Sequence, residues 1–330
     1  MGLLRSAAAA MWAAILRVLV YLVTGYIFFL YSERMFWARW RPAEDGAESF
    51  IITWITYSIA AACCVVLIRD YRVHATGPMF LVGAVLGWLV EGVFTMTFFG
   101  AGGIPFPFTI AWTGLSWHAL ISVVIGWLWL HRAMQHSVAR TAKLSAGLGV
   151  AWGVWSIYWD TVSPPGTALE FLAHTLGTTL LMIVAFRLYP LLRTGRLRPG
   201  MSDRLVLGAL VLGWFGAATV PTFTWLALVT LPPLFALVWL ALRINARVET
   251  APDFLDELAR PVPWSRSLTL LLIPVLATLI HEGCRATGLS APTNLLGFFI
   301  TLPLGFWCFY ASLRGQFRLR RAAASAIRQS

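Results

Sequence analysis

The amino-acid sequence predicts an all-α, polytopic integral membrane protein with about ten transmembrane helices and both termini in the cytoplasm. Three observations support this prediction: the composition, the number of long apolar segments, and the side on which the basic residues fall. Of the 330 residues, 59% are hydrophobic and only 12% are charged, and the mean hydropathy is +0.75. Soluble domains carry about a quarter charged residues. The composition therefore excludes that class and predicts a single membrane domain over residues 1–330.

Ten apolar segments are long enough to cross, or nearly cross, a hydrocarbon core of about 30 Å. The first follows an N-terminus that looks like a signal peptide, but its apolar run continues to Tyr31 and is too long for a cleaved one. Only the stretch TVPTF separates the seventh from the eighth, so these two are expected to form a tight hairpin or one broken pair. The segments span residues 11–31, 50–68, 78–99, 112–134, 144–162, 169–191, 205–220, 222–242, 268–284 and 294–312.

The basic residues fall mainly on one side of these segments. If the N-terminus is cytoplasmic, the inner loops and termini hold 19 Arg and Lys residues, whereas the outer loops hold 4. This bias follows the positive-inside rule and supports an even number of crossings. It also explains the net charge of +11 without nucleic acid as a partner. We expect the chain to lie in a bacterial plasma (inner) membrane, in contact with membrane lipids.

Two connecting stretches are not simple crossings. The outer loop over residues 100–112 is apolar yet rich in Gly and Pro. Irregular backbone survives at membrane depth only when it is buried in protein or lines a cavity, so a re-entrant, lid-like loop is expected. The inner loop 243–267 is expected to form a short amphipathic helix on the inner membrane interface. The basic cytoplasmic tail, 313–330, is expected to contact anionic headgroups.

Seven acids and histidines, from five helices, enter the apolar segments in the predicted outer half. These are Glu91, His118, Asp160, Glu170, His174, His281 and Glu282. The inner half holds only His131, at its edge. Because burying an ionisable group costs several kcal/mol, such residues mark a functional site in a membrane protein by default. We therefore expect the seven to face one cavity that opens to the outer, extracytoplasmic leaflet.

The carboxylates of this set are candidate catalytic groups: Glu91, Asp160, Glu170 and Glu282. A carboxylic acid in an apolar cavity is suited to acid–base work on a weakly basic substrate. Glu170 and His174 are four residues apart and share one helix face. They are expected either to bind one metal ion or to form a carboxylate–imidazole hydrogen bond.

The histidines are candidate ligands of one zinc or iron ion: His118, His174 and His281. Three such ligands leave an open position for water, which the metal would activate as a hydroxide nucleophile. The stretch HEGCR begins like the HExxH motif of zinc peptidases. However, Arg285 stands where the second histidine should be, so it is not that motif.

Four outer arginines are candidate substrate-binding residues: Arg34, Arg39, Arg41 and Arg285. Arginine binds phosphate groups through two parallel hydrogen bonds, so the first three could clamp a lipid phosphate. Trp37 and Trp40 lie between them and suit the headgroup layer. The alternative interpretation is therefore a simple membrane-surface anchor. Arg285 would either neutralise an acid of the cluster or hold an anionic substrate.

The stretch EGVFTMTFFGAGGIPFPF, residues 91–108, has an acid followed by a Gly-x-Pro-Phe element. It resembles the membrane-embedded carotenoid hydratases, in which an intramembrane acid precedes a similar turn. The resemblance covers 18 of the 330 residues. It implies a role for Glu91 and nothing further.

These observations favour a membrane-embedded enzyme that acts on a lipid or isoprenoid-like substrate reaching it from the outer leaflet. It would be either a metal-dependent hydrolase or an acid–base enzyme that protonates an alkene. Two alternatives from other classes remain open. One is a ten-helix secondary transporter for a small molecule, although such a carrier should have its polar site near the midplane. The other is an accessory or redox subunit of a membrane complex, with histidines that bind haem.

Overall fold

The computed structural model describes residues 2–41, 45–101, 104–162 and 166–329. In this part of the chain the fold is all-α apart from one two-stranded hairpin, which confirms the all-α part of the predicted fold class. The elements in chain order are α1 (Gly2–Phe29), η1 (Leu30–Met35), α2 (Ala47–Asp70), α3 (Thr76–Trp88), η2 (Leu89–Phe94), η3 (Thr97–Phe99), β1 (Gly100–Ala101), β2 (Ile104–Pro105), η4 (Ile110–Trp129), α4 (Leu130–His136), α5 (Val138–Val162), α6 (Ala168–Leu191), η5 (Thr194–Arg196), α7 (Met201–Trp214), η6 (Phe215–Thr219), α8 (Val220–Val248), α9 (Phe254–Leu258), α10 (Trp264–Leu268), η7 (Thr269–Leu271), α11 (Leu272–Ala286) and α12 (Thr293–Gln329).

Within the described residues, nine helical stretches are long and apolar enough to cross a membrane. They are Ala8–Met35, Ala47–Asp70, Thr76–Phe94, Ile110–His136, Ala168–Leu191, Met201–Phe223, Trp225–Val248, Trp264–Ala286 and Thr293–Arg321. These nine correspond to nine of the ten predicted segments. The remaining segment, 144–162, is also helical and lies in α5, which does not belong to this apolar set. Nine such helices fit an integral, multi-pass membrane protein.

Close backbone packing holds the central helices together. A Cβ atom added at Gly83 of α3 would lie 2.6 Å from the Cα of Ala119, and one at Gly87 would lie 2.6 Å from the Cα of Gly114, so η4 presses directly on α3. In α5, a Cβ atom at Gly149 would lie 2.7 Å from the Ile273 carbonyl oxygen of α11. Small residues at such contacts are typical of membrane helix packing.

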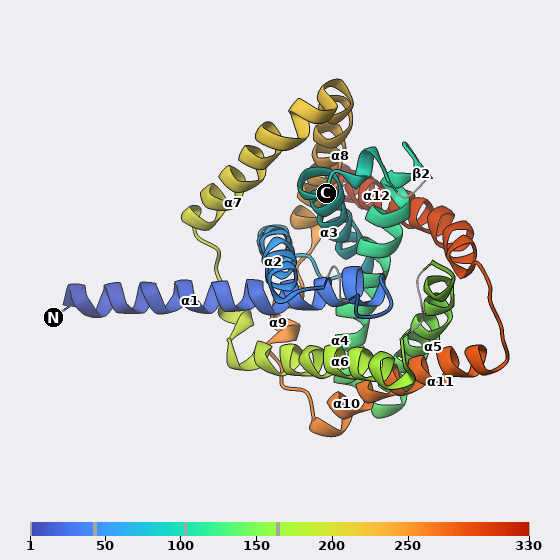
Figure 1. The fold of residues 1–330 in the computed structure, drawn as a ribbon. Coiled ribbons are helices and arrows are strands. Elements are labelled where there is room, and N and C mark those ends of the chain that lie inside the picture. The colour runs from blue at the N-terminus through green and yellow to red at the C-terminus, as the bar shows by residue number, and fades with distance from the viewer. Residues whose placement is uncertain (1, 42–44, 102–103, 163–165, 330) are drawn as a thin grey trace.

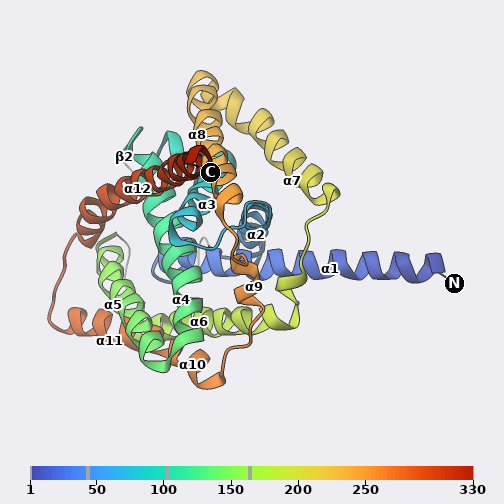
Figure 2. The same cartoon turned by 180° about the vertical axis from the view of Figure 1, so that it is seen from behind.

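Two elements project from this core. The N-terminal part of α1 extends beyond the other helices, and α7 meets α8 at η6 to form a V whose α7 arm lies apart (Figures 1 and 2). No residue of α7 is buried. The seventh and eighth predicted segments are therefore α7 and α8, the two arms of this V, and they form the broken pair that was one of the two expected arrangements.

The loops contact one another in two separate groups. In the first group, Arg69 in the last turn of α2 pairs with Asp253 before α9 at 2.7 Å, and Arg266 of α10 donates to the Gln135 carbonyl of α4 at 2.6 Å. In the second group, Asp160 at the end of α5 bonds to both Arg39 and His281. Because α6 and α11 each run from one group to the other, the two groups lie at opposite ends of the helices.

The inner loop 243–267 differs from its prediction in one respect. It does contain a short helix, α9, which begins at the capping residue Asp253. However, Phe254, Leu255 and Leu258 are fully buried, and the Phe254 ring packs edge-on against Trp127 of η4. The apolar face of α9 therefore packs against the protein core and not against a membrane surface. The predicted tail 313–330 continues α12 to Gln329, and Ser330 lies outside the described residues.

Candidate active site in an aromatic cavity

A cavity of about 680 Å³ lies between η1, η2, η4, α5 and α12. Nine of its 22 lining residues are Phe, Trp or Tyr, and these include Trp37, Trp112, Trp155 and Trp159. We call it the aromatic cavity. Its volume falls in the range of about 300–1,000 Å³ that small-molecule sites occupy.

The Gly- and Pro-rich loop 100–112 contributes to the wall of the aromatic cavity through Ile104, Pro105 and Thr109. Its first part forms the β1–β2 hairpin, in which Gly100 pairs with Pro105; residues 102 and 103 lie outside the described part of the chain. The loop thus lines a cavity, as irregular apolar backbone should. Its re-entrant path through a membrane stays a prediction.

A chain of hydrogen bonds links Glu91 to His118 in this wall. Glu91 Oε1 lies 2.7 Å from His118 Nε2, and the other carboxylate oxygen accepts a hydrogen bond from Thr97. On the far side of the ring, His118 Nδ1 lies 2.7 Å from the Ser32 hydroxyl, which is 2.9 Å from that of Ser122. Both ring nitrogens are therefore held, which fixes the orientation of the imidazole.

Two of the predicted site residues, Glu91 and His118, are thus in contact. They come from η2 and η4, both of which contain π-helical turns. Such turns are rare and are frequent at functional sites, because they redirect side chains out of the regular helical register. Both residues line the cavity, and Glu91 is the more accessible of the two, because its side chain is 12% exposed and that of His118 is 2% exposed.

A second carboxylate, Glu33, lines the same cavity. Its Oε1 accepts a hydrogen bond from the Tyr57 hydroxyl at 2.9 Å, and its Oε2 accepts one from the Trp37 indole at 2.8 Å. The sequence predicts the first segment to end at Tyr31, which would leave Glu33 in a loop. In the structure the helix continues as η1 to Met35, so Ser32 and Glu33 belong to the span. The absence of any Gly or Pro between residues 26 and 41 is the sequence signal for this continuation.

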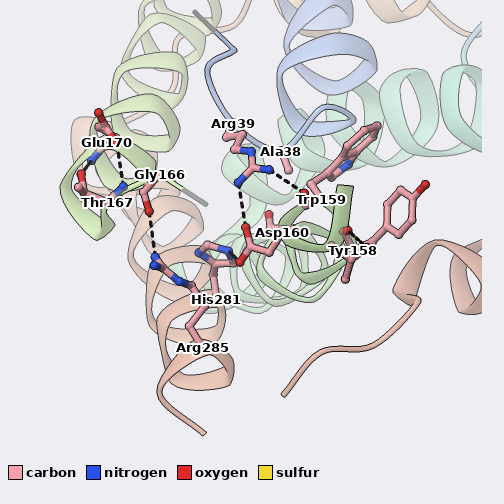
Figure 3. A network of polar contacts seen from close by, with 12 residues as sticks. Ala38, Arg39, Tyr158, Trp159, Asp160, Gly166, Thr167, Glu170, His281 and Arg285 are labelled. Carbon is pink, nitrogen blue, oxygen red and sulfur yellow. Dashed lines mark hydrogen bonds and ion pairs between the residues drawn. The ribbon is translucent and has the colours of Figure 1, made fainter. Parts of the chain in front are cut away.

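The outer polar network contains five further ionisable residues: Arg39, Asp160, His281, Glu282 and Arg285. Figure 3 shows four of them, Arg39, Asp160, His281 and Arg285. Asp160 accepts from Arg39 at 2.9 Å and lies 2.9 Å from His281 Nε2. Arg285 donates to Glu282 at 2.9 Å and to the Gly166 carbonyl at 3.0 Å. None of the five lines the aromatic cavity. The network joins the ends of η1, α5 and α11 to the start of α6.

Glu170 and His174 do not form the predicted pair. Glu170 lies at the start of α6, where it forms a capping box with Thr167 that includes a 2.7 Å bond from the Thr167 backbone N–H. His174 Nε2 instead lies 3.2 Å from the Arg34 carbonyl. The N-terminal position of Glu170 explains the difference, because its side chain folds back onto unpaired backbone N–H groups.

The first three outer arginines make internal ion pairs. Arg34 bonds to Asp45 at 2.8 Å, with both side chains buried, and Arg41 lies 3.4 Å from the same carboxylate. Arg39 pairs with Asp160. These contacts fix the segment after η1 onto the helices, and a clamp for a lipid phosphate stays a prediction.

The three candidate metal ligands stand in three different hydrogen-bonded groups. His118 contacts Glu91, His281 contacts Asp160, and His174 contacts a backbone carbonyl. Among the residues that the structure describes, no group of three or more His, Cys, Asp or Glu side chains is arranged to hold a metal ion. The predicted single cluster thus divides between the aromatic cavity and the outer polar network, with Glu170 and His174 in neither, and a zinc or iron ion stays a prediction.

No known protein family, curated protein or solved structure matches this chain. The geometry of the aromatic cavity is therefore the basis for a functional proposal.

Proposed function

We propose that this chain is a membrane-embedded acid–base enzyme that protonates a carbon–carbon double bond of an isoprenoid-like substrate. The observation that carries the proposal is the Glu91–His118 pair in the wall of the aromatic cavity. An apolar cavity of this size suits a hydrocarbon substrate, and its few polar groups are acid–base groups and hydroxyls. The resemblance of residues 91–108 to carotenoid hydratases points to the same acid.

Glu91 is the proton donor in this proposal. The O–H bond of the protonated carboxyl breaks, a C–H bond forms with the π electrons of the alkene, and a carbocation remains on the neighbouring carbon. The faces of Trp, Tyr and Phe attract a cation, so the indole rings of Trp112, Trp117 and Trp155 would stabilise that charge. His118 holds the carboxyl in position through Nε2 and can return a proton to it.

Glu33 is the proton acceptor. Tyr57 and Trp37 each donate to one of its oxygens, which favours the ionised carboxylate, the form that a proton acceptor needs at the start of the reaction. It would take a proton from the carbon beside the cation, which restores a double bond. Alternatively, it would take a proton from a water molecule that adds to the cation. The first course gives an isomerase or cyclase, and the second gives a hydratase.

The burial of the Ser32–His118–Glu91 chain argues against a serine hydrolase. In such an enzyme the serine faces the substrate and the carboxylate lies behind the imidazole. Here Ser32 is 4% exposed and hydrogen-bonded on both sides, whereas Glu91 is the most exposed member. Ser32 is therefore a positioning residue for His118.

The depth of the cavity argues against a transporter. Ser32, Glu33 and Glu91 lie in the last two turns of their spans, Ala8–Met35 and Thr76–Phe94. A carrier that alternates access needs its polar site near the middle of the membrane. A cavity near one end suits a lipid-like substrate that enters from the adjacent leaflet.

We also propose ten crossings, with both termini in the cytoplasm of a bacterial cell and the aromatic cavity near the extracytoplasmic side. The two groups of loops support this count. Gln135, just before α5, bonds to Arg260 in one group, while Asp160, at the other end of α5, bonds to His281 in the other. α5 thus runs between the groups and supplies the tenth crossing.

The test uses the full chain in lipid nanodiscs, incubated in D₂O with a linear isoprenoid polyene such as squalene or geranylgeraniol. We expect deuterium to enter a carbon–hydrogen bond of the product. Glu91→Gln should slow this by about 10²-fold or more. Glu282→Gln, in the outer polar network, is the matched control and should retain the activity. Equal deuterium incorporation by the wild type and by Glu91→Gln would contradict the proposal.

A further inference from the structure

A second pocket, of about 600 Å³, lies in the first group of loops, at the opposite end of the helices from the outer polar network. The segment between η5 and α7, the turn after α2 and the loop before α9 form its wall. Four arginines line it: Arg69, Arg72, Arg198 and Arg204. We call it the arginine pocket. Its charge content distinguishes it from the aromatic cavity, and none of its residues enters the proposed reaction.

Two of these arginines pair with the three aspartates of the pocket. Arg204 bonds to both oxygens of Asp70, at 2.6 and 3.0 Å. Arg69 bonds to Asp253 at 2.7 Å and to Asp256 at 3.1 Å. Every carboxylate in the wall therefore already has an arginine partner.

Arg72 and Arg198 have no such partner within the described part of the chain. Arg72 Nη1 reaches the Glu249 carbonyl at 3.5 Å, and Arg198 Nη1 reaches the Gly195 and Leu197 carbonyls at 3.3 and 3.0 Å. Both side chains are exposed at the pocket. A backbone carbonyl does not cancel a full positive charge, so these two guanidinium groups can still pair with an anion. The four arginines exceed the three aspartates by one, which gives the pocket a net positive charge.

The surrounding contacts fix the backbone segments next to these two arginines. Arg69 is 9% exposed and also donates to the Thr194 and Gly195 carbonyls, which ties the η5 turn to α2. The Asn245 side chain donates to the Tyr71 and Arg72 carbonyls, which fixes the turn that carries Arg72. A site that is rigid before binding loses less entropy when it binds a ligand.

The position of the arginine pocket indicates the source of an anion. The spans Ala47–Asp70 and Trp225–Val248 end beside it, and the span Met201–Phe223 begins beside it. The ends of membrane helices lie at the level of lipid headgroups. Anionic headgroups are attracted to juxtamembrane arginines, and arginine binds phosphate oxygens through parallel hydrogen bonds.

We propose that the arginine pocket binds a phosphate-bearing anion, with Arg72 and Arg198 as its ligands. The bound group is either the headgroup of an anionic phospholipid or free phosphate. The two sources share their chemistry but differ in the attached acyl chains.

The test measures both sources on the full chain. Native mass spectrometry detects retained phosphatidylglycerol, with phosphatidylcholine as the neutral comparison, and titration calorimetry measures inorganic phosphate. The Arg72→Gln/Arg198→Gln double variant should weaken binding of the anion by about tenfold or more. It removes two positive charges, and each of them attracts an anionic headgroup at the membrane surface. Arg193→Gln/Arg196→Gln is the matched control. Arg193 and Arg72 both have positive φ, and neither Arg193 nor Arg196 lines the pocket.

The result identifies the source as well as the site. Arginine-dependent retention of phosphatidylglycerol without binding of inorganic phosphate supports a headgroup. Arginine-dependent binding of inorganic phosphate that competes with the lipid supports free phosphate. The proposal is overturned if neither anion binds, or if the two double variants bind as tightly as each other. Thermal unfolding of both double variants verifies that each is folded.

Discussion

At the scale of single residues, Glu33 and Glu91 share one cavity but have different partners. Glu33 accepts hydrogen bonds from the Tyr57 hydroxyl and the Trp37 indole, and both groups act as donors to its carboxylate. Glu91 faces an imidazole, which can hold or release a proton. In the proposed reaction, this difference favours Glu33 as the proton acceptor and Glu91 as the proton donor.

The substitution Glu33→Gln tests this assignment. We expect product formation to fall by about 10²-fold or more, because Gln cannot accept a proton from the substrate. Protonation by Glu91 precedes that step, so the variant should still bind the polyene. Product formation is measured by mass spectrometry and binding by quenching of tryptophan fluorescence. Glu48→Gln, at an exposed position, is the control. Full activity of Glu33→Gln would remove Glu33 from the mechanism.

The buried pair of Arg34 and Asp45 predicts a loss of stability in acid. Burial acts to raise the pKa of Asp45, but hydrogen bonds from the Arg34 guanidinium and the Arg41 backbone N–H hold it below its ordinary value. A lowered pKa in the folded state stabilises the fold at every pH above the unfolded value of about 4. This contribution is lost as the pH falls below that value.

Thermal unfolding in detergent between pH 7 and pH 3 measures this effect. The wild type should lose stability over the lower part of this range. Asp45→Asn should already be less stable by about 3 kcal/mol at pH 7, because it leaves Arg34 buried without its partner. It should also depend less on pH below 4. Identical acid profiles for the two proteins would show that the pair contributes nothing.

The sequence predicts how far along its helix each site residue lies, but it does not predict which way the side chain points. The sequence locates Glu91, His118 and His281 along their helices, and all three belong to the ends predicted to face outward. It does not give the rotation of each helix about its axis, which depends on packing against every neighbour. His281 therefore faces Asp160 and a stacked Phe171 ring at 4.3 Å, not His118. Glu33 was missed because a helix end is uncertain by several residues.

At the scale of elements, the contact between α3 and η4 positions the acid. η2 continues α3 and carries Glu91, while η4 carries His118. The distance between these two side chains therefore depends on how closely the two helices approach. Gly83, Gly87 and Gly114 allow that approach because they present no side chain at the crossing.

The substitution Gly87→Ala tests the role of this crossing. The new methyl group would meet the backbone of Gly114, with its Cα at 2.6 Å, and neither backbone can move without shifting a helix. We expect a loss of about 1–3 kcal/mol in stability and a loss of activity. Gly147→Ala in α5 is the control, because nothing lies within 4 Å of its new Cβ. It should be neutral or slightly stabilising. Thermal unfolding and product formation are the measurements, and wild-type values for Gly87→Ala would exclude a tight crossing.

The apolar segments were predictable because a span must be both long and apolar. The sequence leaves open whether a short helix such as α9 packs on the membrane surface or against the protein core. Phe254, Leu255 and Leu258 suit either surface equally well. The core is available because Trp127 presents a ring that Phe254 covers. Only the arrangement of the other helices determines which of these two surfaces α9 packs against.

At the scale of the whole molecule, the separation of loops into two groups follows the predicted sides. The loops that share Arg69, Arg132 and Arg266 are those assigned to the cytoplasm from their basic residues, and they contact one another. The outer polar network joins the ends assigned to the other side. The charge bias in the sequence and the contacts in the structure are independent observations, and both fit the proposed ten crossings, in which α5 connects the two sides.

Labelling of single cysteines decides whether α5 crosses. Its 25 residues span about 37 Å, enough for a hydrocarbon core of about 30 Å. In a background with Cys63, Cys64, Cys284 and Cys308 replaced by serine or alanine, Lys143→Cys and Thr161→Cys report the two exposed ends of α5. A membrane-impermeant maleimide should label Thr161→Cys in intact cells and Lys143→Cys only in inverted vesicles. Labelling of both from one side would mean that α5 lies along the membrane. The sides of α6 to α12 would then be reversed, and the ends joined by the outer polar network could no longer share one side of the membrane.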